Sequence, residues 1–159
     1  MLTERKVLVF DMDNTLNKFT EVEGWLDDLR NESVRPYLEA KPKYDMDVFC
    51  QLVERLRFDG WMICITTWLA GGASKAYNEA VRRAKREWLD VWGMPYDKLS
   101  MVKYGTTKAN CTRKLGGFQI LFDDNEKVRK GWTLGDGVDA NEKIIPYLEN
   151  LLLDDIMEV

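Results

Sequence analysis

The sequence predicts an α/β fold, a Rossmann-like three-layer αβα sandwich around a central parallel sheet of about five strands. Short, continuous apolar runs alternate with segments of helical periodicity, which is the pattern of a parallel sheet covered by helices on both faces. Several of these runs end in acids or threonines, where the carboxyl ends of parallel strands border a ligand site. The 159 residues, of which 45% are apolar and 31% charged, suffice for one domain with a substantial core.

The first half of the chain contains two predicted strands and one predicted helix. Residues 7–10 and residues 62–66 are short apolar runs of the kind found in buried strands. Residues 45–57 carry apolar side chains at three- and four-residue spacing, which predicts a helix capped by an aspartate. Residues 16–44 lack this periodicity, so we expect an irregular flap or short insert within a single domain covering residues 1–159.

The second half continues the alternation of helices and strands. A long amphipathic helix is expected over residues 73–92, because Gly93 and Pro95 follow it in the order typical of helix ends. Its apolar side consists of Tyr77, Ala80, Val81, Ala84, Trp88, Val91 and Trp92. The other expected elements are a strand at 98–103, a helix at 106–115, a strand at 118–122, a helix ending at 130, a brief strand at 132–134 and a helix at 141–153.

Composition excludes several classes of chemistry. The chain has no histidine, which excludes Ser-His-Asp and Cys-His catalysis and every His-ligated metal site. Its three cysteines include no Cys-x-x-Cys pair, so neither a zinc knuckle nor a redox site is indicated. The net charge of −4 gives no global attraction for nucleic acid. Without a membrane-length apolar run or a signal peptide, we expect a cytoplasmic protein with no membrane partner.

Two pairs of acidic residues follow two of the predicted strands. Asp11 and Asp13 come after the first strand, and Asp123 and Asp124 come after the fourth. Several carboxylates at one sheet edge repel one another unless a cation intervenes. Mg²⁺ fits, because it takes one or two carboxylates, waters and a phosphate oxygen. For the first pair alone, a strand-end turn with solvated acids is an equal alternative.

Hydroxyl and ammonium groups between these strands provide candidate phosphate contacts. Thr66 and Thr67 follow the second strand, where a hydroxyl can donate to a phosphate oxygen; filling a strand position is the alternative. Lys108 opens a predicted helix, where its ammonium would neutralise a bound phosphate. Lys103 and Lys114 lie in the same interval and remain alternatives to Lys108.

The order of these groups resembles the haloacid dehalogenase (HAD) superfamily of phosphohydrolases. The matching segments are residues 7–16, which include Asp-Met-Asp-Asn-Thr, then residues 63–66, a lysine, and residues 120–124. The resemblance spans residues 5–135. It implies a Mg²⁺-dependent phosphomonoesterase in which Asp11 attacks phosphorus and forms an aspartyl phosphate.

The same resemblance implies roles for the other residues. Asp13 would protonate the leaving alkoxide and then activate the hydrolytic water. Thr66 and Lys108 would hold the transferring phosphoryl group and stabilise its charge. The implied metal ligands are Asp11, the backbone carbonyl of Asp13 and Asp124, with Asp123 orienting the bound waters or the lysine.

Three other charged segments are assigned no catalytic role. Residues 135–139 resemble the Gly-Asp form of the family's last motif, but the run before them is short and poorly apolar. Residues 154–155 are expected to be a solvated helix end. The basic residues of segment 82–86, which include Lys85, are expected to form a solvated helix face, with contact to a phosphate backbone as the alternative.

The short insert leaves no room for a large cap, as in 5′-nucleotidases and the phosphatase module of polynucleotide kinase-phosphatases. Trp68 stands where that module carries an arginine, which counts against a polynucleotide substrate. Phe19, Trp25, Tyr37 and Trp68 offer a stacking surface for a base, or pack the flap onto the core. The expected partner is a small phosphorylated substrate or a nucleic-acid terminus. The alternatives are a receiver-type phosphoacceptor without catalysis, and a phosphatase of sugar phosphates or phosphoproteins.

Overall fold

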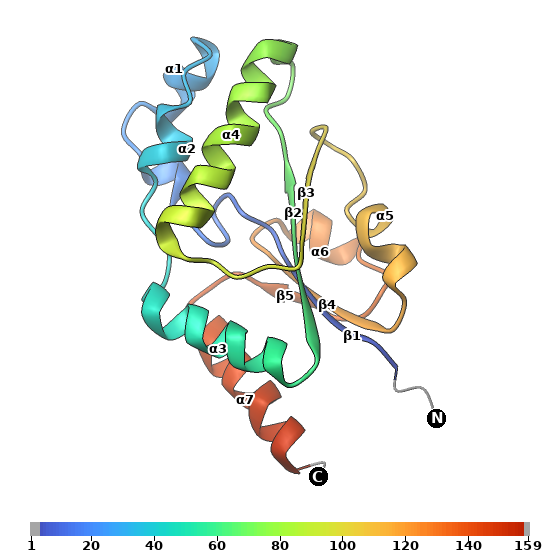
Figure 1. The fold of residues 1–159 in the computed structure, drawn as a ribbon. Coiled ribbons are helices and arrows are strands. Elements are labelled where there is room, and N and C mark those ends of the chain that lie inside the picture. Colours follow the sequence, from blue (N-terminus) through green and yellow to red (C-terminus); the bar gives the residue numbers. More distant parts are fainter. Residues whose placement is uncertain (1–3, 158–159) are drawn as a thin grey trace.

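A five-stranded parallel sheet forms the centre of the computed structural model, which describes residues 4–157 (Figure 1). Its strands lie in the order β3-β2-β1-β4-β5, which confirms the predicted α/β fold class. After β1 the chain adds β2 and β3 on one side of it, and β4 and β5 then follow on the other side. Ligands bind beyond the carboxyl ends of the strands at such a switch point. The strands are β1 (Lys6–Phe10), β2 (Trp61–Trp68), β3 (Lys98–Val102), β4 (Phe118–Asp123) and β5 (Gly137–Asp139).

The central strand β1 is buried on both faces. Leu8 and Phe10 point to one face and Val7 and Val9 to the other, and all four side chains are fully buried. Phe10 stacks on Phe122 of β4 with ring centroids 4.8 Å apart. A strand covered on both sides needs an apolar residue at every position, which explains the continuous apolar run in the sequence.

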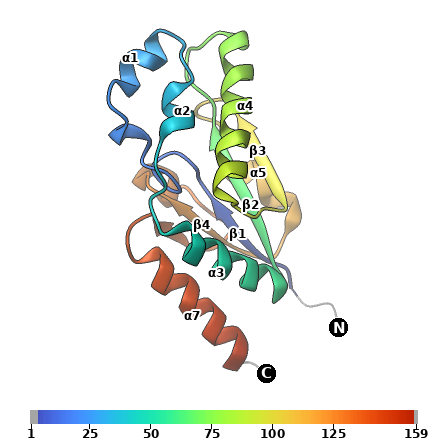
Figure 2. The same ribbon diagram turned by 60° about the vertical axis from the view of Figure 1, so that its left-hand side comes forward.

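Helices cover both faces of the sheet (Figures 1 and 2). The face of Leu8 and Phe10 is covered by α3, α4 and α7, and the face of Val7 and Val9 by α5, η2 and α6. None of the helices within residues 4–157 combines the length and the apolar character needed to span a membrane. The helices are α3 (Met46–Phe58), α4 (Lys75–Trp92), α5 (Ala109–Thr112), the 3-10 helix η2 (Arg113–Leu115), α6 (Glu126–Lys130) and α7 (Ile144–Met157).

The ends of α3 and α4 are set by local side-chain chemistry. Asp45 caps α3 by accepting hydrogen bonds from two backbone N–H groups of the first turn. Ser74 caps α4 by accepting from the backbone N–H of Tyr77 at 3.1 Å. Gly93 ends α4 with a φ of 69°, a left-handed conformation that glycine adopts without steric cost.

The insert after β1 contains short helices, so the expectation of an irregular segment was wrong in this respect. Its elements η1 (Phe19–Glu21), α1 (Trp25–Arg30) and α2 (Arg35–Glu39) lie beside α4 (Figure 2). Phe19 and Tyr37 are buried with ring centroids 4.7 Å apart, in one apolar cluster with residues of α4. These aromatic anchors supply the burial that stabilises helices too short to form alone.

The last strand lies further along the chain than expected. The segment 132–134 forms no strand, because Trp132 turns inward and its Nε1 donates to the carbonyl oxygen of Gln119 at 3.1 Å. Gly135 then approaches β4 so closely that an added Cβ would lie 2.1 Å from that same oxygen. A close approach at a glycine, rather than an apolar run, therefore brings β5 to the sheet edge.

Three helices also differ from the sequence expectation, one of them α7, which was expected at 141–153 and spans Ile144–Met157. The helix expected at 106–115 begins at Ala109, and the residues before it form a loop. Near the end of α4, Val91 and Trp92 are 70% and 38% exposed, although they were assigned to its apolar side. The buried side of α4 therefore ends at Leu89. It consists of Tyr77, Val81, Ala84, Lys85, Trp88 and Leu89.

The carboxyl end of α7 is anchored to the sheet. Asp155 accepts hydrogen bonds from Lys6 Nζ and from Trp61 Nε1, each at 2.9 Å. Its side chain is only 13% exposed, so the expectation of a solvated helix end was wrong for this residue.

Candidate active site

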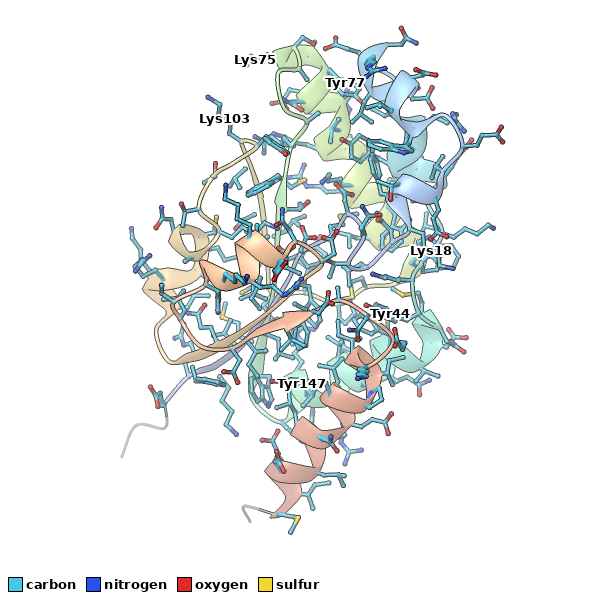
Figure 3. All side chains as sticks on the ribbon, turned by 180° about the vertical axis from the view of Figure 1, so that it is seen from behind. Lys18, Tyr44, Lys75, Tyr77, Lys103 and Tyr147 are labelled. Atoms are coloured by element: carbon cyan, nitrogen blue, oxygen red, sulfur yellow. The ribbon has the colours of Figure 1, made fainter. Side chains whose placement is uncertain are left out.

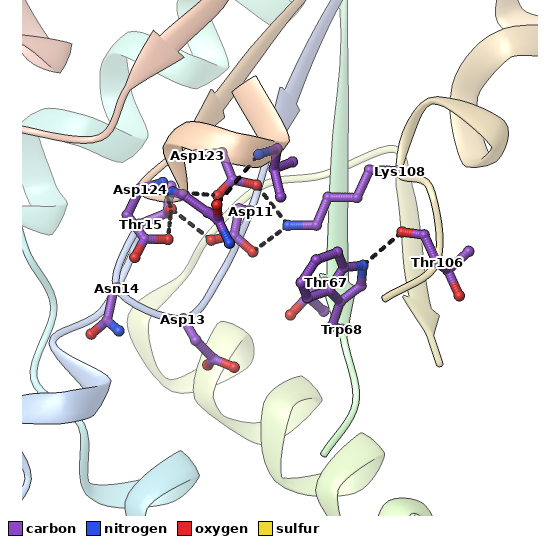
Figure 4. Close-up of polar contacts among 12 residues, drawn as sticks. Asp11, Asp13, Asn14, Thr15, Thr67, Trp68, Thr106, Lys108, Asp123 and Asp124 are labelled. Carbon is purple, nitrogen blue, oxygen red and sulfur yellow. Dashed lines mark hydrogen bonds and ion pairs between the residues drawn. The ribbon is translucent and has the colours of Figure 1, made fainter. Parts of the chain in front are cut away.

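Acidic side chains from two neighbouring strands meet at the carboxyl edge of the sheet (Figure 4). Asp11 follows β1, Asp123 ends β4, and Asp124 comes next. The strands are parallel neighbours with Phe10 beside Phe122 in register, so the acids that follow them are brought together. Each of the three acids offers a carboxylate oxygen within 4.8 Å of the others.

Lys108 joins two of these acids. Its Nζ donates to Asp11 Oδ1 and to Asp123 Oδ2, each at 2.7 Å, and its side chain is buried. Burial disfavours the charged ammonium, but the carboxylates of Asp11 and Asp123 outweigh it and raise the pKa of Lys108. The ammonium therefore stays protonated at neutral pH, where it partly offsets the negative charge of the cluster.

The two other candidate lysines lie away from this cluster. Lys103 is exposed at the end of β3 and points outward from the molecule (Figure 3). Lys114 is exposed in η2. Among the described residues, Lys108 is the one of these three lysines that contacts a carboxylate of the site.

The acid cluster has the chemistry of a hard divalent cation site. Partial desolvation, followed by repulsion from Asp11, raises the pKa of Asp124 to about 7. Burial, followed by the charge of Asp11, also raises the pKa of Asp123, although Lys108 opposes the shift. Carboxylates that resist ionisation this strongly gain from a bound cation, and an all-oxygen ligand set suits Mg²⁺ or Ca²⁺.

The turn after Asp11 is fixed by its own polar side chains. Asn14 has a φ of 61°, a left-handed conformation that asparagine tolerates better than most residues. Asn17, which is fully buried, accepts a hydrogen bond from the backbone N–H of Asn14 at 2.9 Å. Thr15 Oγ1 donates to Asp11 Oδ2 at 2.7 Å and accepts from the backbone N–H of Asp124 at 3.2 Å. The turn therefore connects the first acid pair to the second.

Asp13 lies on the other side of the site, where it contacts Lys85 of α4. Lys85 Nζ donates to Asp13 Oδ2 at 2.9 Å, and the lysine side chain is 0% exposed. The expected solvated face is therefore wrong for Lys85, although Arg83 and Arg86 are exposed as expected. Sequence reasoning missed this lysine because lysine is rarely buried.

The two threonines of β2 occupy different environments. Phe10 pairs with Ile65, so Thr66 takes the next register position, beside Asp11. Thr66 is fully buried, and its hydroxyl has no hydrogen-bond partner among the described residues. Thr67 lines the cavity at the site, and its Oγ1 accepts from Lys85 Nζ at 2.6 Å.

A cavity of about 310 Å³ opens over the acids. Asp11, Asp13, Asp123 and Asp124 line its polar side. The insert and the β2 and β3 ends supply its aromatic walls, namely Phe19, Trp25, Tyr37, Trp68 and Tyr104.

Like Lys108, Trp68 lines both this cavity and a second one of about 410 Å³. Its Nε1 donates to the carbonyl oxygen of Thr106 at 2.8 Å, and its ring centroid lies 5.1 Å from Lys108 Nζ. The ring packs against Tyr104 at 5.0 Å. The ammonium of Lys108 therefore lies over the Trp68 ring at a distance typical of cation–π pairs.

The comparisons with known proteins agree on the fold. No protein family model and no curated protein matches the sequence. A chain of a solved Pnkp1/Rnl/Hen1 complex matches with a TM-score of 0.57 at 15% identity, over 89% of this chain and 48% of its own length. This chain therefore spans about half the length of that relative.

Two further solved structures match over nearly their full length. A HAD-like phosphatase from Mesorhizobium loti has a TM-score of 0.57 at 11% identity, with 98% of this chain and 88% of that chain covered. A D,D-heptose 1,7-bisphosphate phosphatase from Burkholderia thailandensis has a TM-score of 0.54 at 13% identity, with 93% and 99% covered. At these identities the likeness establishes the fold, and on that ground the chain has the fold of the HAD-like phosphatases.

Proposed function

We propose that this chain is a phosphomonoesterase that requires Mg²⁺ and forms an aspartyl phosphate on Asp11. The observation that carries the proposal is the fixed position of the Asp11 carboxylate inside the acid cluster. Lys108 donates to Oδ1 and Thr15 to Oδ2, each at 2.7 Å. A carboxylate held by both oxygens is oriented for attack on one bound atom, which removes much of the entropic cost of the reaction.

The reaction proceeds in two displacements at phosphorus. A carboxylate oxygen of Asp11 forms a bond to phosphorus while the bond to the leaving oxygen breaks, and Asp13 gives its proton to that oxygen. Asp13 then takes a proton from a water molecule that attacks the same phosphorus atom. The bond between phosphorus and Asp11 breaks, and inorganic phosphate and the free carboxylate result.

Three groups would hold the phosphoryl oxygens. Lys108 supplies a positive charge, and Thr67 lines the cavity. Thr66 would be the third donor: its buried hydroxyl has no partner among the described residues, although Thr67 and not Thr66 lines the cavity. Donors fixed in advance around a developing charge are a large source of catalysis.

The metal would be held by Asp11 and Asp124, with the backbone carbonyl of Asp13 as a third ligand. Asp123 would orient Lys108 rather than bind the metal directly. Both of its oxygens already accept hydrogen bonds, Oδ2 from Lys108 Nζ and Oδ1 from the backbone N–H of Asn125. When bound, Mg²⁺ supplies positive charge that offsets repulsion between the carboxylates and the phosphate.

The substrate that we favour is a nucleotide or the end phosphate of a nucleic acid. The aromatic walls of the cavity offer ring surfaces on which a base can stack. A second relative with a TM-score of 0.57 belongs to a Pnkp1/Rnl/Hen1 complex described as an RNA repair complex, which also supports this class. The insert at residues 16–44 would act as a flap, since it contributes three of the wall residues.

A sugar phosphate is the second candidate substrate. The heptose bisphosphate phosphatase has the same fold and matches over nearly its whole length. The charges of the cavity disfavour a bisphosphate, because its lining contains four aspartates and one lysine. A second phosphate on the substrate would find no further lysine or arginine among the lining residues.

Phosphate release from a substrate panel tests the proposal. The panel comprises p-nitrophenyl phosphate, nucleoside monophosphates, sugar phosphates and oligonucleotides with 5′- or 3′-phosphates, each assayed with Mg²⁺ and with EDTA. We expect Mg²⁺-dependent release that Asp11→Asn abolishes. Asp136→Asn is the matched control, because Asp136 is exposed in the competing Gly-Asp segment. Full activity in Asp11→Asn contradicts the proposed nucleophile.

A further inference from the structure

Lys85 has no role in the chemistry proposed above, yet all three hydrogen-bond acceptors of its ammonium belong to residues that line the cavity. Its Nζ donates to Asp13 Oδ2 at 2.9 Å, to Thr67 Oγ1 at 2.6 Å and to the carbonyl oxygen of Trp68 at 2.9 Å. These three contacts use all three N–H groups of an ammonium. The side chain is fully buried, and the Tyr37 ring centroid lies 5.3 Å from Nζ.

The fold alone gives no reason for a charge at this position. Val81 and Leu89 lie one turn before and after Lys85 on α4, and both are fully buried. An apolar side chain of similar volume would fill the same line of the helix without the cost of desolvating an ammonium. The lysine is therefore explained by its acceptors, two of which are side chains that line the cavity.

We propose that Lys85 is a positioning residue that sets Asp13 for proton transfer to the leaving group. This inference rests on the proposed function. Lys85 holds Oδ2 of Asp13, while Oδ1 has only a long 3.4 Å contact from Asn17 Nδ2. Oδ1 is thus the oxygen left to exchange a proton with the substrate, and its direction is fixed through Oδ2.

Lys85 also sets the direction of the Thr67 hydroxyl. Because Thr67 Oγ1 accepts from Lys85, its own hydrogen points away from that ammonium. Thr67 lines the cavity, so this hydrogen is available to a phosphate oxygen. One buried ammonium therefore orders both a proton-transfer group and a phosphate donor.

The dependence on the leaving group separates positioning from a general structural role. p-Nitrophenolate leaves without a proton, whereas the alkoxide of an alkyl phosphate such as β-glycerophosphate needs the proton of Asp13. We expect Lys85→Met to lower kcat/KM for β-glycerophosphate about 100-fold and for p-nitrophenyl phosphate less than about 10-fold. Arg83→Met, on the exposed face of the same helix, should change neither value. Equal losses on the two substrates, or no loss, would overturn the proposal.

A double-mutant cycle with Asp13→Asn tests whether Lys85 acts through Asp13. If it does, Lys85→Met costs no more on β-glycerophosphate in the Asp13→Asn background than the small loss, less than about 10-fold, expected on p-nitrophenyl phosphate, whereas independent roles multiply the full losses. Lys85→Gln, which keeps a donor without the charge, serves if the methionine variant does not fold. Failure of the proposed function is distinguishable, because the wild-type protein would then release no phosphate from either substrate.

Discussion

The ammonium of Lys108 lies 2.7 Å from Oδ1 of Asp11, although 97 positions separate the two residues in the chain. The same ammonium reaches Asp123 at the end of β4, and its other neighbour is the Trp68 ring. One side chain from the loop before α5 therefore meets groups from β1, β2 and β4.

Lys108→Met should lower phosphate release about 100- to 1,000-fold, the usual cost of losing one donor to a developing charge. The variant also leaves Asp11 and Asp123 side by side without a cation, so metal-free protein should unfold at a lower temperature at pH 8. Steady-state kinetics and thermal unfolding measure the two effects. Lys103→Met and Lys114→Met are matched controls and should keep wild-type activity. Equal loss in all three variants would contradict the assignment.

Stability of the metal-free protein should fall as pH rises toward neutrality. The pKa of Asp124 is raised to about 7, whereas an aspartate in an unfolded chain titrates near about 3.9. Between these values the folded state holds a proton that the unfolded state has lost. The stabilising contribution is therefore present below about pH 4 and is lost as pH rises through about 7.

Thermal unfolding in EDTA at pH 5.5 and pH 8 measures this dependence. Asp124→Asn should flatten it, because the amide does not titrate. Mg²⁺ binds the ionised carboxylate, so it should raise the unfolding temperature more at pH 8 than at pH 5.5. A slope that Asp124→Asn leaves unchanged would place the titrating group elsewhere.

Thr66→Val and Thr67→Val should differ in their effects on stability. The Thr66 hydroxyl has no partner among the described residues, so valine should leave stability unchanged or raise it. Thr67→Val removes an acceptor from the buried ammonium of Lys85 and should cost about 1–3 kcal/mol. If both hydroxyls hold phosphate, each variant loses about 100- to 1,000-fold in kcat. Denaturant unfolding and kinetics on the same samples check both expectations.

The sequence allowed the sheet and the acid cluster to be predicted because both depend on local signals. The apolar run at 7–10 predicts a strand buried on both faces. Parallel pairing of this strand with β4 then brings Asp11 beside Asp123. The strand at the sheet edge could not be predicted in this way. It depends on the inward turn of Trp132 and the close approach of Gly135, which are long-range contacts without a periodic signal.

Lys85 shows a different limit of sequence reasoning. It lies four residues from Val81 and from Leu89, so helical spacing placed it on the buried line of α4. Its charge outweighed this spacing, because a lysine is rarely buried without a partner. The partner Asp13 lies 72 positions away, and only the folded chain brings the two together.

Tyr104→Ala tests whether the aromatic walls bind a base. Tyr104 is 61% exposed and packs against Trp68, so its removal should leave the fold intact. Stacking of one base is worth about 1–3 kcal/mol, so KM for a nucleoside monophosphate should rise roughly 10-fold. KM for β-glycerophosphate, which has no ring, should stay the same, and so should kcat for both substrates. Steady-state kinetics with the two substrates separate the outcomes, because a parallel rise in both KM values would show that Tyr104 acts on the phosphate site and not on a base.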